Sequence, residues 1–353
     1  MGKSLVVNFY REHKDDVLKT VTNPFILSLV VAVVIIIALP PIFNKYKLDI
    51  VQRTRLQPHQ MLYYADLNND GVSEKIEFRQ QLETFFYVTV STKNKVIDQW
   101  NFQGKVLLTN KLPVTKAGND SLKSIWFFVL HDHKIYLNCL NPFENKFPVK
   151  NKFVTNYVPK NKSTDCHPHF CTFFDSNKDG IKEFYFFTET GYSRQPRAVF
   201  KYDPATDSVY SSDKSYADIT QSMLVDSTNH QLDLIFTSFA VGNTPLDDPY
   251  SDMFSWLMCY NHSLTLKYKP VKIGFYPSES TITPLFVDGN KYFVVMNIYK
   301  GVQKHLCSLR LFNTQLKLIK QKKFSFSPGW WGAKLYSPKK QLPFFYIINP
   351  DYS

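Results

Sequence analysis

Residues 66–78, DLNNDGVSEKIEF, and residues 175–187, DSNKDGIKEFYFF, carry the same acidic loop, and each loop runs into an apolar stretch. The shared pattern is D-x-N-x-D-G-x-x-E. The first copy also satisfies the EF-hand pattern with Glu77 in the twelfth place, but the twelfth residue of the second copy is Phe186, which cannot bind a cation. An EF-hand needs a helix on each side, whereas both loops lead into segments typical of strands. We therefore interpret them as loop-to-strand turns, with Glu77 on one face of the following strand.

Both loops carry oxygen-bearing side chains at alternate positions, and such an all-oxygen set suits Ca²⁺. The glycine at the sixth position lets the backbone turn without a Cβ clash. We expect each loop to bind one Ca²⁺ weakly and for a structural purpose. The predicted ligands are Asp66, Asn68, Asp70, the Val72 carbonyl and Glu74 in the first loop, and Asp175, Asn177, Asp179, the Ile181 carbonyl and Glu183 in the second. The alternative is a pair of turns that bind nothing, because Asp, Asn and Gly favour turns on their own.

Four weaker copies of the turn give the chain a repeat of about 50 residues. Each copy is a polar turn followed by an apolar segment, anchored at Asp120, Asp226, Asp288 and Ser337. With Asp66 and Asp175 included, the intervals between successive anchors are 54, 55, 51, 62 and 49 residues. A unit of this length with several short strands is typical of a β-propeller blade. A β-sandwich array is the alternative, but its units would be nearer about 100 residues.

The sequence therefore predicts an all-β fold, a β-propeller of about six blades over residues 57–353, in which strand-favouring side chains dominate. The sixth unit begins near Ser337 and has room for one or two strands before Ser353. Either residues 46–64 close the ring, or the chain is truncated and further blades follow Ser353. We expect the second, because a blade cut after its first strands leaves an open edge.

One segment of the chain has the length and composition of a membrane anchor. Residues 25–43 are uncharged and apolar, which is just sufficient because a helix needs about 20 residues to cross the hydrocarbon core. The ALPP of residues 38–41 offers no good signal-peptidase site. We expect a short cytoplasmic segment at residues 1–23, an uncleaved transmembrane signal anchor at residues 24–43 and a linker at residues 44–56.

The charges that flank this segment do not decide its orientation. Four basic residues precede it and four follow it closely, so the positive-inside count is a tie. The acidic loops decide instead, because weak Ca²⁺ sites fill at millimolar external Ca²⁺ and stay empty in the cytosol. We expect a single-pass protein of the cell membrane whose β-domain is extracytoplasmic, in the periplasm or at the cell surface.

The composition of the chain argues against some classes of partner and of activity. The net charge is +12, but lysine is scattered over most of the length, whereas a nucleic-acid binder gathers its basic residues on one segment. We expect no nucleic-acid partner; a solvated basic surface or attraction to an anionic envelope or polysaccharide are the alternatives. The chain has no G-x-S-x-G, P-loop or H-E-x-x-H motif, so we expect no enzyme in these residues. His131 and His133 fall on one exposed strand or turn face.

The five cysteines do not form a readable disulfide pattern, because their number is odd and their spacing irregular. CHPHFC, residues 166–171, looks like a metal motif, but no second ligand pair follows it at zinc-finger spacing. Alternation along a strand directs Cys166 and Cys171 to opposite faces. A local disulfide or two free thiols is the prediction there. Trp330 and Trp331 are either a packing pair or an exposed ligand platform.

The acidic loops and the apolar strands that follow them resemble the FG-GAP or VCBS-type repeats of β-propeller proteins, and the resemblance covers residues 57–353. The FG-GAP letters themselves are not legible, and four units lack the full ligand set. The resemblance therefore implies Ca²⁺ only for the first and third units.

An N-terminal anchor followed by such repeats is also similar, in architecture alone, to the extracytoplasmic input region of bacterial membrane sensor histidine kinases. This resemblance implies a membrane-anchored sensor that binds an unknown extracellular or periplasmic ligand, a glycan or a protein, with a kinase module encoded beyond residue 353. The alternative is a calcium-stabilised cell-surface binding or adhesion module without a signalling domain.

Overall fold

The computed structural model of the chain describes residues 23, 24, 28, 32 and 33 and residues 59–348, with gaps at 83, 93–94, 108–110, 117–121, 158–165, 191–196, 227–230, 248, 301–304, 327–331 and 337–343. The chain divides into two compact units, Met1–Gln57 and Pro58–Ser353. Among the described residues, no helix has the length and apolarity needed to cross a membrane. The predicted anchor lies outside the described residues except at positions 24, 28, 32 and 33, as do residues 1–22 and the predicted linker.

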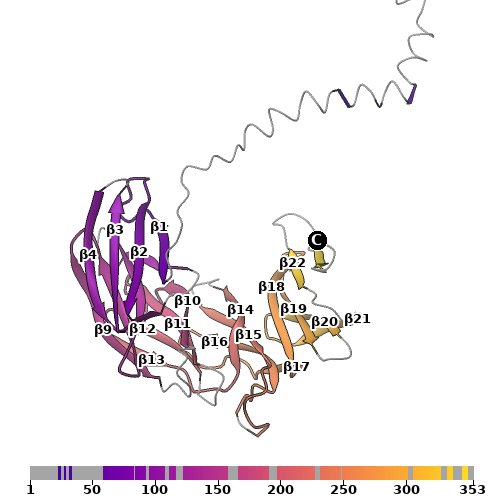
Figure 1. Ribbon diagram of the computed structural model, residues 1–353. Coiled ribbons are helices and arrows are strands. Elements are labelled where there is room, and N and C mark those ends of the chain that lie inside the picture. Colours follow the sequence, from indigo (N-terminus) through magenta and orange to yellow (C-terminus); the bar gives the residue numbers. More distant parts are fainter. Residues whose placement is uncertain are drawn as a thin grey trace, which may run out of the picture. The chain divides into compact units, whose positions relative to one another are not determined.

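The second unit is built of antiparallel sheets that follow one another along the chain (Figure 1). Sheet 1 contains β1 (Gln60–Ala65), β2 (Glu74–Leu82), β3 (Phe85–Thr92) and β4 (Lys95–Gln103). Sheet 2 contains β5 (Lys105–Leu107), β6 (Val114–Lys116), β7 (Lys123–His131), β8 (Lys134–Asn141) and β9 (Lys146–Asn156). Sheet 3 contains β10 (Cys166–Phe174), β11 (Glu183–Thr190), β12 (Ala198–Asp203) and β13 (Ser208–Ser211).

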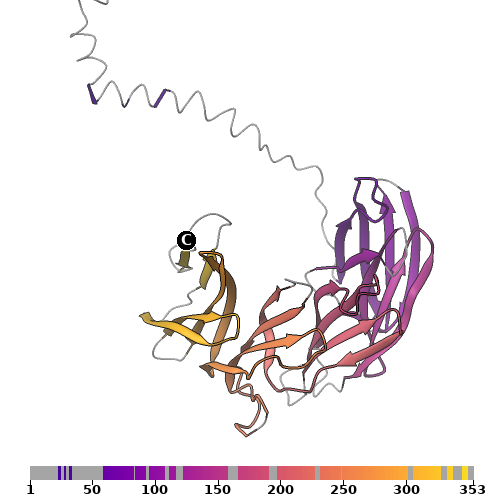
Figure 2. The ribbon, with the colours of Figure 1, turned by 180° about the vertical axis from the view of Figure 1, so that it is seen from behind.

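The remaining strands continue this order, as the view from behind also shows (Figure 2). Sheet 4 contains β14 (Asp218–Asp226), β15 (Asp233–Phe239), β16 (Phe254–Asn261) and β17 (Val271–Phe275). Sheet 5 contains β18 (Ser278–Val287), β19 (Asn290–Lys300), β20 (His305–Asn313) and β21 (Leu318–Phe326). A further pair, β22 (Gly332–Tyr336) and β23 (Phe344–Ile348), forms a two-stranded sheet.

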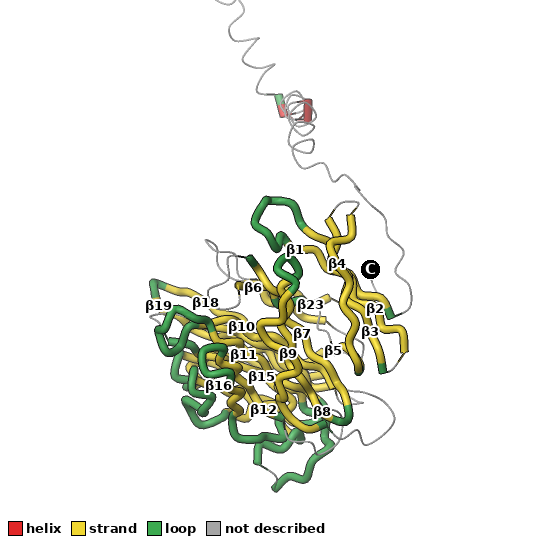
Figure 3. The backbone as a smooth tube through the Cα atoms, turned by 90° about the vertical axis from the view of Figure 1, so that its left-hand side faces the viewer, coloured by secondary structure: helices red, strands yellow, loops and turns green. Residues whose placement is uncertain are grey.

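The all-β prediction is confirmed for the second unit, in which strands and their connecting loops make up the described backbone (Figure 3). Sheets 1, 3, 4 and 5 are four-stranded meanders, each with its strands in chain order. Sheet 2 differs at its first strand, which is replaced by the short strands β5 and β6, both paired with β7. A four-stranded antiparallel meander is the unit of a propeller blade, so the fold is propeller-like.

The turns used as repeat anchors occupy the same place in each sheet. Asp66 and Asp175 directly follow β1 and β10, Asp226 ends β14, and Asp288 directly follows β18. Each anchor therefore lies in the hairpin between the first and second strands of its sheet. Asp120 and Ser337 lie outside the described residues. The period of about 50 residues in the sequence is thus the length of one sheet with its connection.

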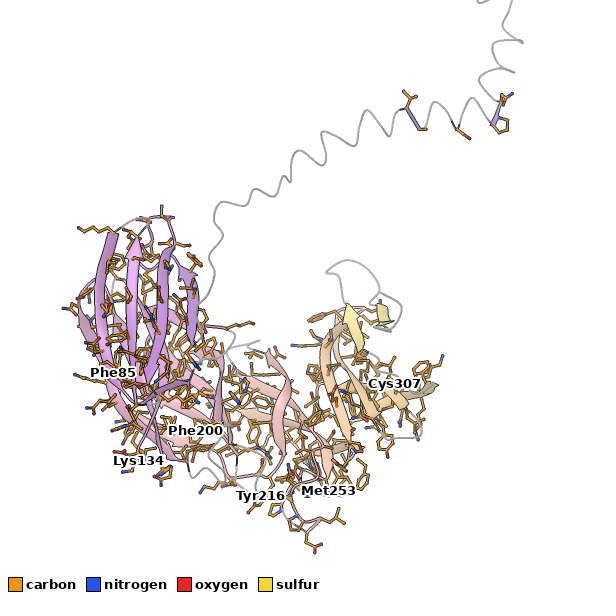
Figure 4. The ribbon with its side chains drawn as sticks, viewed as in Figure 1. Phe85, Lys134, Phe200, Tyr216, Met253 and Cys307 are labelled. Atoms are coloured by element: carbon orange, nitrogen blue, oxygen red, sulfur yellow. The ribbon has the colours of Figure 1, made fainter. Side chains whose placement is uncertain are left out.

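Neighbouring sheets pack face to face in chain order. Four hydrophobic clusters join sheets 1 and 2, 2 and 3, 3 and 4, and 4 and 5. β11 shows how a central strand serves two clusters, because Phe184 and Phe186 face sheet 2 while Tyr185 and Phe187 face sheet 4. The Phe186 ring stacks on that of Phe200, with 5.3 Å between centroids. Phe200 is labelled in Figure 4. Continuous apolar runs such as FYFF arise because both faces of these strands are buried.

Candidate functional site

Loop 1, residues 66–74, joins β1 to β2 and is held together by its own side chains. Asn68 Oδ1 accepts a hydrogen bond from the Asp70 N–H at 3.0 Å, and Asp70 Oδ1 accepts one from the Val72 N–H at 2.7 Å. Asp66 Oδ2 accepts the Gly71 N–H at 3.2 Å. Gly71 has φ +83°, in the region that L side chains rarely adopt. The predicted ligand side chains therefore bend around one turn, as their spacing requires.

Glu74 closes loop 1 from the first position of β2. Its side chain is 1% exposed, and its Oε2 accepts the Leu67 N–H at 2.7 Å. Glu77 has a different environment: it lies inside β2, where it accepts a hydrogen bond from Gln60 Nε2 at 2.6 Å and lies 3.2 Å from Lys75 Nζ. The interpretation of Glu77 as a strand residue is thus confirmed.

Loop 2, residues 175–183, repeats this geometry bond for bond. Asn177 Oδ1 accepts the Asp179 N–H at 3.1 Å, and Asp179 Oδ1 accepts the Ile181 N–H at 2.7 Å. Asp175 Oδ2 accepts the Gly180 N–H at 3.0 Å, and Gly180 has φ +86°. Glu183, at the start of β11, is 1% exposed and accepts the Ser176 N–H at 2.7 Å. Identical bonds at identical positions show that the shared residues dictate the turn.

Both loops contain buried carboxylate oxygens without a hydrogen-bond donor among the described residues. These oxygens are Asp66 Oδ1 and Glu74 Oε1 in loop 1 and Asp175 Oδ1 in loop 2. A buried carboxylate oxygen without a partner costs about 1–3 kcal/mol or more, so such groups are rare unless an ion or a water satisfies them. The residues present therefore fit a cation, which would take these oxygens as ligands.

The side chains are not gathered into a finished metal site. In the part of the chain that the structure describes, no group of three or more His, Cys, Asp or Glu side chains is arranged closely enough to hold a metal ion. One reason is that Asn68 Nδ2 donates to Asp70 Oδ2 at 2.9 Å, and Asn177 Nδ2 donates to Asp179 Oδ2 at the same distance. A cation would have to replace these amide–carboxylate bonds.

The two loops differ in what surrounds them. Lys123, the first residue of β7 in sheet 2, donates from Nζ to the Asp66 carbonyl at 2.8 Å and from its backbone N–H to the Leu67 carbonyl at 2.9 Å. In loop 2 the Ser176 hydroxyl donates to Glu183 Oε1 at 2.8 Å, so both oxygens of Glu183 have donors. Loop 1 thus has a lysine of the next sheet bound to its backbone and a glutamate oxygen without a donor among the described residues, whereas both oxygens of Glu183 in loop 2 have donors.

The fourth unit uses a lysine at the equivalent turn. Asp226 Oδ2, at the end of β14, lies 2.5 Å from Nζ of Lys291, the second residue of β19 in sheet 5. Asp233, which begins β15, is bound by Lys267 Nζ at 2.9 and 2.7 Å to its two oxygens. In this unit, lysines balance the carboxylates.

The structure separates the remaining candidates that the sequence contains. Cys166 packs between sheets 2 and 3 and Cys171 between sheets 3 and 4, so the two sulfurs lie on opposite faces, as predicted. All five cysteines are buried free thiols, and the local disulfide is not formed. Burial raises the pKa of Cys307 to about 11 and that of Cys259 to about 12, which keeps these thiols protonated. His169 stacks on Phe187, and Trp330 and Trp331 lie outside the described residues.

No family model matches the chain, and a search of curated proteins finds no match. Among solved structures, it is similar to a prolyl endopeptidase at 12% identity, covering 82% of this chain and 40% of that chain, with a TM-score of 0.37. It is similar to an ACO/RPE65 chimera at 9% identity, covering 76% of this chain and 61% of that chain, with a TM-score of 0.38. A chain of the BBS1N–ARL6DN complex also matches at 9% identity, covering 86% and 96% of the two chains, with a TM-score of 0.29.

These structural similarities are too low to indicate a function for the chain. The chain covers only 40% of the prolyl endopeptidase and 61% of the chimera, and all three TM-scores are 0.38 or lower. They therefore carry no argument about activity, ligand or partner.

Proposed function

We propose that the chain is a membrane-anchored, extracytoplasmic β-propeller of FG-GAP or VCBS type that is stabilised by Ca²⁺ in loops 1 and 2. In this proposal it binds an extracellular or periplasmic ligand, a glycan or a protein, and forms the input part of a signal-transduction protein such as a sensor histidine kinase. Residues 24–43 hold it in the membrane, and about six blades of about 50 residues make up the β-domain.

The observation that carries this proposal is the pair of equivalent loops with buried, donor-free carboxylate oxygens. Two turns with the same four hydrogen bonds from backbone N–H groups to side chains, at the same place in two sheets, support a common purpose. Short loops whose ligands all come from one turn bind Ca²⁺ weakly, with Kd on the order of 10⁻⁴ to 10⁻³ M. Such sites are filled only outside the cytosol, which supports an extracytoplasmic β-domain.

The first test is a Ca²⁺ binding measurement on the full-length chain, purified in detergent because of residues 25–43. Isothermal titration should give two weak sites, and Mg²⁺ at the same concentrations should compete poorly because it demands near-ideal octahedral geometry. No heat of binding at millimolar Ca²⁺ would overturn the calcium part of the proposal.

The location has its own test. Protease added to intact cells or spheroplasts should remove the β-domain, and full protection of that domain would reverse the proposed orientation. The signalling role is tested by the coding sequence that follows residue 353. A second apolar segment with a kinase or regulator module supports the sensor, whereas an immediate stop codon favours the adhesion module.

A further inference from the structure

A pocket of about 370 Å³ lies between sheets 1 and 2 and is lined by residues of β4, β7, β8 and β9. We call it the β4–β9 pocket, after the strands that supply most of its lining; both are labelled in Figure 1. Its volume is at the lower end of the range of small-molecule sites, about 300–1,000 Å³. None of its lining residues belongs to loop 1 or loop 2, so it is a separate site.

One wall of the pocket is shaped by a β-bulge. Lys150 and Asn151 of β9 together stand opposite a single residue of β8, Asn138. Asn151 has φ +49°, and its N–H donates at 2.9 Å to Oδ1 of Asn138, whose side chain is completely buried. Bulges re-aim side chains and are common beside binding sites. Here the bulge brings both Lys150 and Asn151 to the lining of the pocket.

A second part of the lining is positioned by a close backbone contact after β4. A Cβ on Gly104 would lie 2.5 Å from the Leu130 carbonyl oxygen and 2.8 Å from Val129 Cγ1. Only glycine allows this approach, which holds the end of β4 against the end of β7. Val129 and His131 of β7 reach the pocket from there.

Four of the residues that line the pocket are aromatic. Phe102 and Phe147 meet edge to face at 5.7 Å between centroids, and Tyr136 adds a third ring. Trp100 Nε1 donates to Asn145 Oδ1 at 2.8 Å, which holds the indole in place. Rigid rings of this kind offer apolar faces on which the C–H groups of a sugar can pack.

The polar groups of the pocket are amides and bases. Asn151 is exposed and can both donate and accept hydrogen bonds, whereas Asn101 and Gln103 alternate with Trp100 and Phe102 along β4 and lie at the rim. Lys150 is exposed, with Nζ 5.3 Å from the Phe147 ring centroid. Among the described residues that line the pocket there is no Asp or Glu. The acid beside His131 is Asp132, which is 80% exposed and lies 3.3 Å from His131 Nε2, outside the lining.

We propose that the β4–β9 pocket binds an acidic saccharide of about disaccharide size. Sugar C–H faces pack on the aromatic rings, the Asn151 amide binds a hydroxyl group, and Lys150 pairs with the carboxylate. A small aromatic acid would use the rings and Lys150 but would leave the Asn151 amide without a partner. This inference rests on the proposed role as a ligand-binding domain and names the class of ligand.

The test is calorimetric titration of the full-length chain with three probes: digalacturonate, its dimethyl ester and benzoate. The ester keeps the rings and hydroxyls but removes both negative charges, so digalacturonate should bind about tenfold more tightly, as expected for one charge-assisted hydrogen bond. Benzoate should bind more weakly than digalacturonate. Equal binding of acid and ester, or preference for benzoate, overturns the proposal.

Two variants assign the binding to this pocket. Lys150→Gln should lower the affinity for digalacturonate about tenfold and leave the affinity for the ester unchanged. Lys214→Gln is the control, because it makes the same charge change at an exposed site in the connection from sheet 3 to sheet 4. It should change neither affinity. Asn151→Gly keeps the left-handed backbone but deletes the amide, and should weaken both saccharides about three- to tenfold. If neither variant affects binding, the proposal is overturned.

Ca²⁺ binding is measured in the same samples. Intact Ca²⁺ binding without saccharide binding overturns the ligand assignment and leaves the proposed function standing. Saccharide binding without Ca²⁺ binding would support the saccharide site in the pocket and contradict the calcium-stabilised propeller.

Discussion

Loop 1 and loop 2 share one set of internal hydrogen bonds but differ in the other partners of their side chains. Within each loop, the first, third, fifth, sixth and ninth residues make the same contacts with nearly the same distances. Beyond the shared bonds, Lys123 approaches loop 1 from sheet 2, whereas in loop 2 the Ser176 hydroxyl donates to Glu183 Oε1. Local sequence therefore dictates the shape of the turn, and residues that vary between the copies determine the electrostatic environment of a bound cation.

The largest expected effect comes from disabling both loops. Bound Ca²⁺ should stabilise the β-domain by RT ln(1 + [Ca²⁺]/Kd), about 1–3 kcal/mol at ten to a hundred times Kd. Asp70→Ala and Asp179→Ala should each remove part of that gain, and the double variant nearly all of it. The measurement is the difference in melting temperature of the full-length chain between millimolar Ca²⁺ and chelator. Asp213→Ala, an exposed carboxylate on a connection of sheet 3, is the control and should leave the difference unchanged.

If the wild-type chain melts at the same temperature in Ca²⁺ and in chelator, both loops are turns that bind no Ca²⁺. A large Ca²⁺ effect that survives in the double variant would move the cation to another part of the chain. Either result would contradict the comparison of the two loops as Ca²⁺ sites.

In chelator, replacing the two buried glutamates by glutamine should change the stability of the domain in opposite directions. In chelator, Glu74→Gln removes a buried charge with one donor-free oxygen and should stabilise the domain by about 1 kcal/mol. Glu183→Gln removes a charge whose two oxygens both accept hydrogen bonds, and should destabilise it by about 0.5–1.5 kcal/mol. Chemical denaturation in chelator measures both values. Equal effects of the two substitutions would show that Ser176 does not matter.

In millimolar Ca²⁺ both glutamine variants should be less stable than the wild type, because each weakens a cation ligand. Stabilisation by Glu74→Gln under both conditions would mean that no cation binds Glu74. Ca²⁺ should therefore change the effect of Glu74→Gln on the domain from stabilising to destabilising.

The glycines should behave alike, since they belong to the part that the loops share. Gly71 and Gly180 have φ of +83° and +86°, and a Cβ at either would meet no atom within 4 Å. Gly71→Ala and Gly180→Ala should therefore cost only the backbone strain, about 1–2 kcal/mol each. Gly104→Ala serves as the contrast and should cost more, because its Cβ would overlap the Leu130 carbonyl. A clear inequality between Gly71→Ala and Gly180→Ala would contradict the equivalence of the two turns.

The features that could be predicted from the sequence are local ones. The acidic loops, the strands after them and the repeat of about 50 residues follow from neighbouring residues, and the anchors Asp66, Asp175, Asp226 and Asp288 all lie in first hairpins. The alternation in KIEF and the unbroken run in FYFF also report burial on one or on two faces. Neighbouring residues in the sequence are sufficient to predict these loops, strands and repeats.

The features that could not be predicted depend on register and on packing between sheets. Lys123 is 57 residues from Asp66 in the chain, and only the packing of sheet 2 on sheet 1 brings them together. The β4–β9 pocket needs the bulge opposite Asn138 and the close approach at Gly104, neither of which has a sequence signal. The splitting of the first strand of sheet 2 likewise has no counterpart in the repeat pattern.

The smallest expected effect tests the neighbour of loop 1 directly. Lys123→Gln removes a positive charge whose Nζ lies 2.8 Å from the Asp66 carbonyl oxygen, close to the three carboxylates of the loop. The repulsion between that ammonium and a bound divalent cation is worth about 1 kcal/mol in a water-like dielectric with physiological salt, so affinity should rise about fivefold. Titration in an Asp179→Ala background reports loop 1 alone. Lys182→Gln, measured on loop 2 in an Asp70→Ala background, should have a smaller effect because Lys182 is exposed and its charge is screened. A loss of affinity on Lys123→Gln would show that the lysine supports the shape of the loop more than it opposes the cation, and that loop 1 depends on sheet 2 for its geometry.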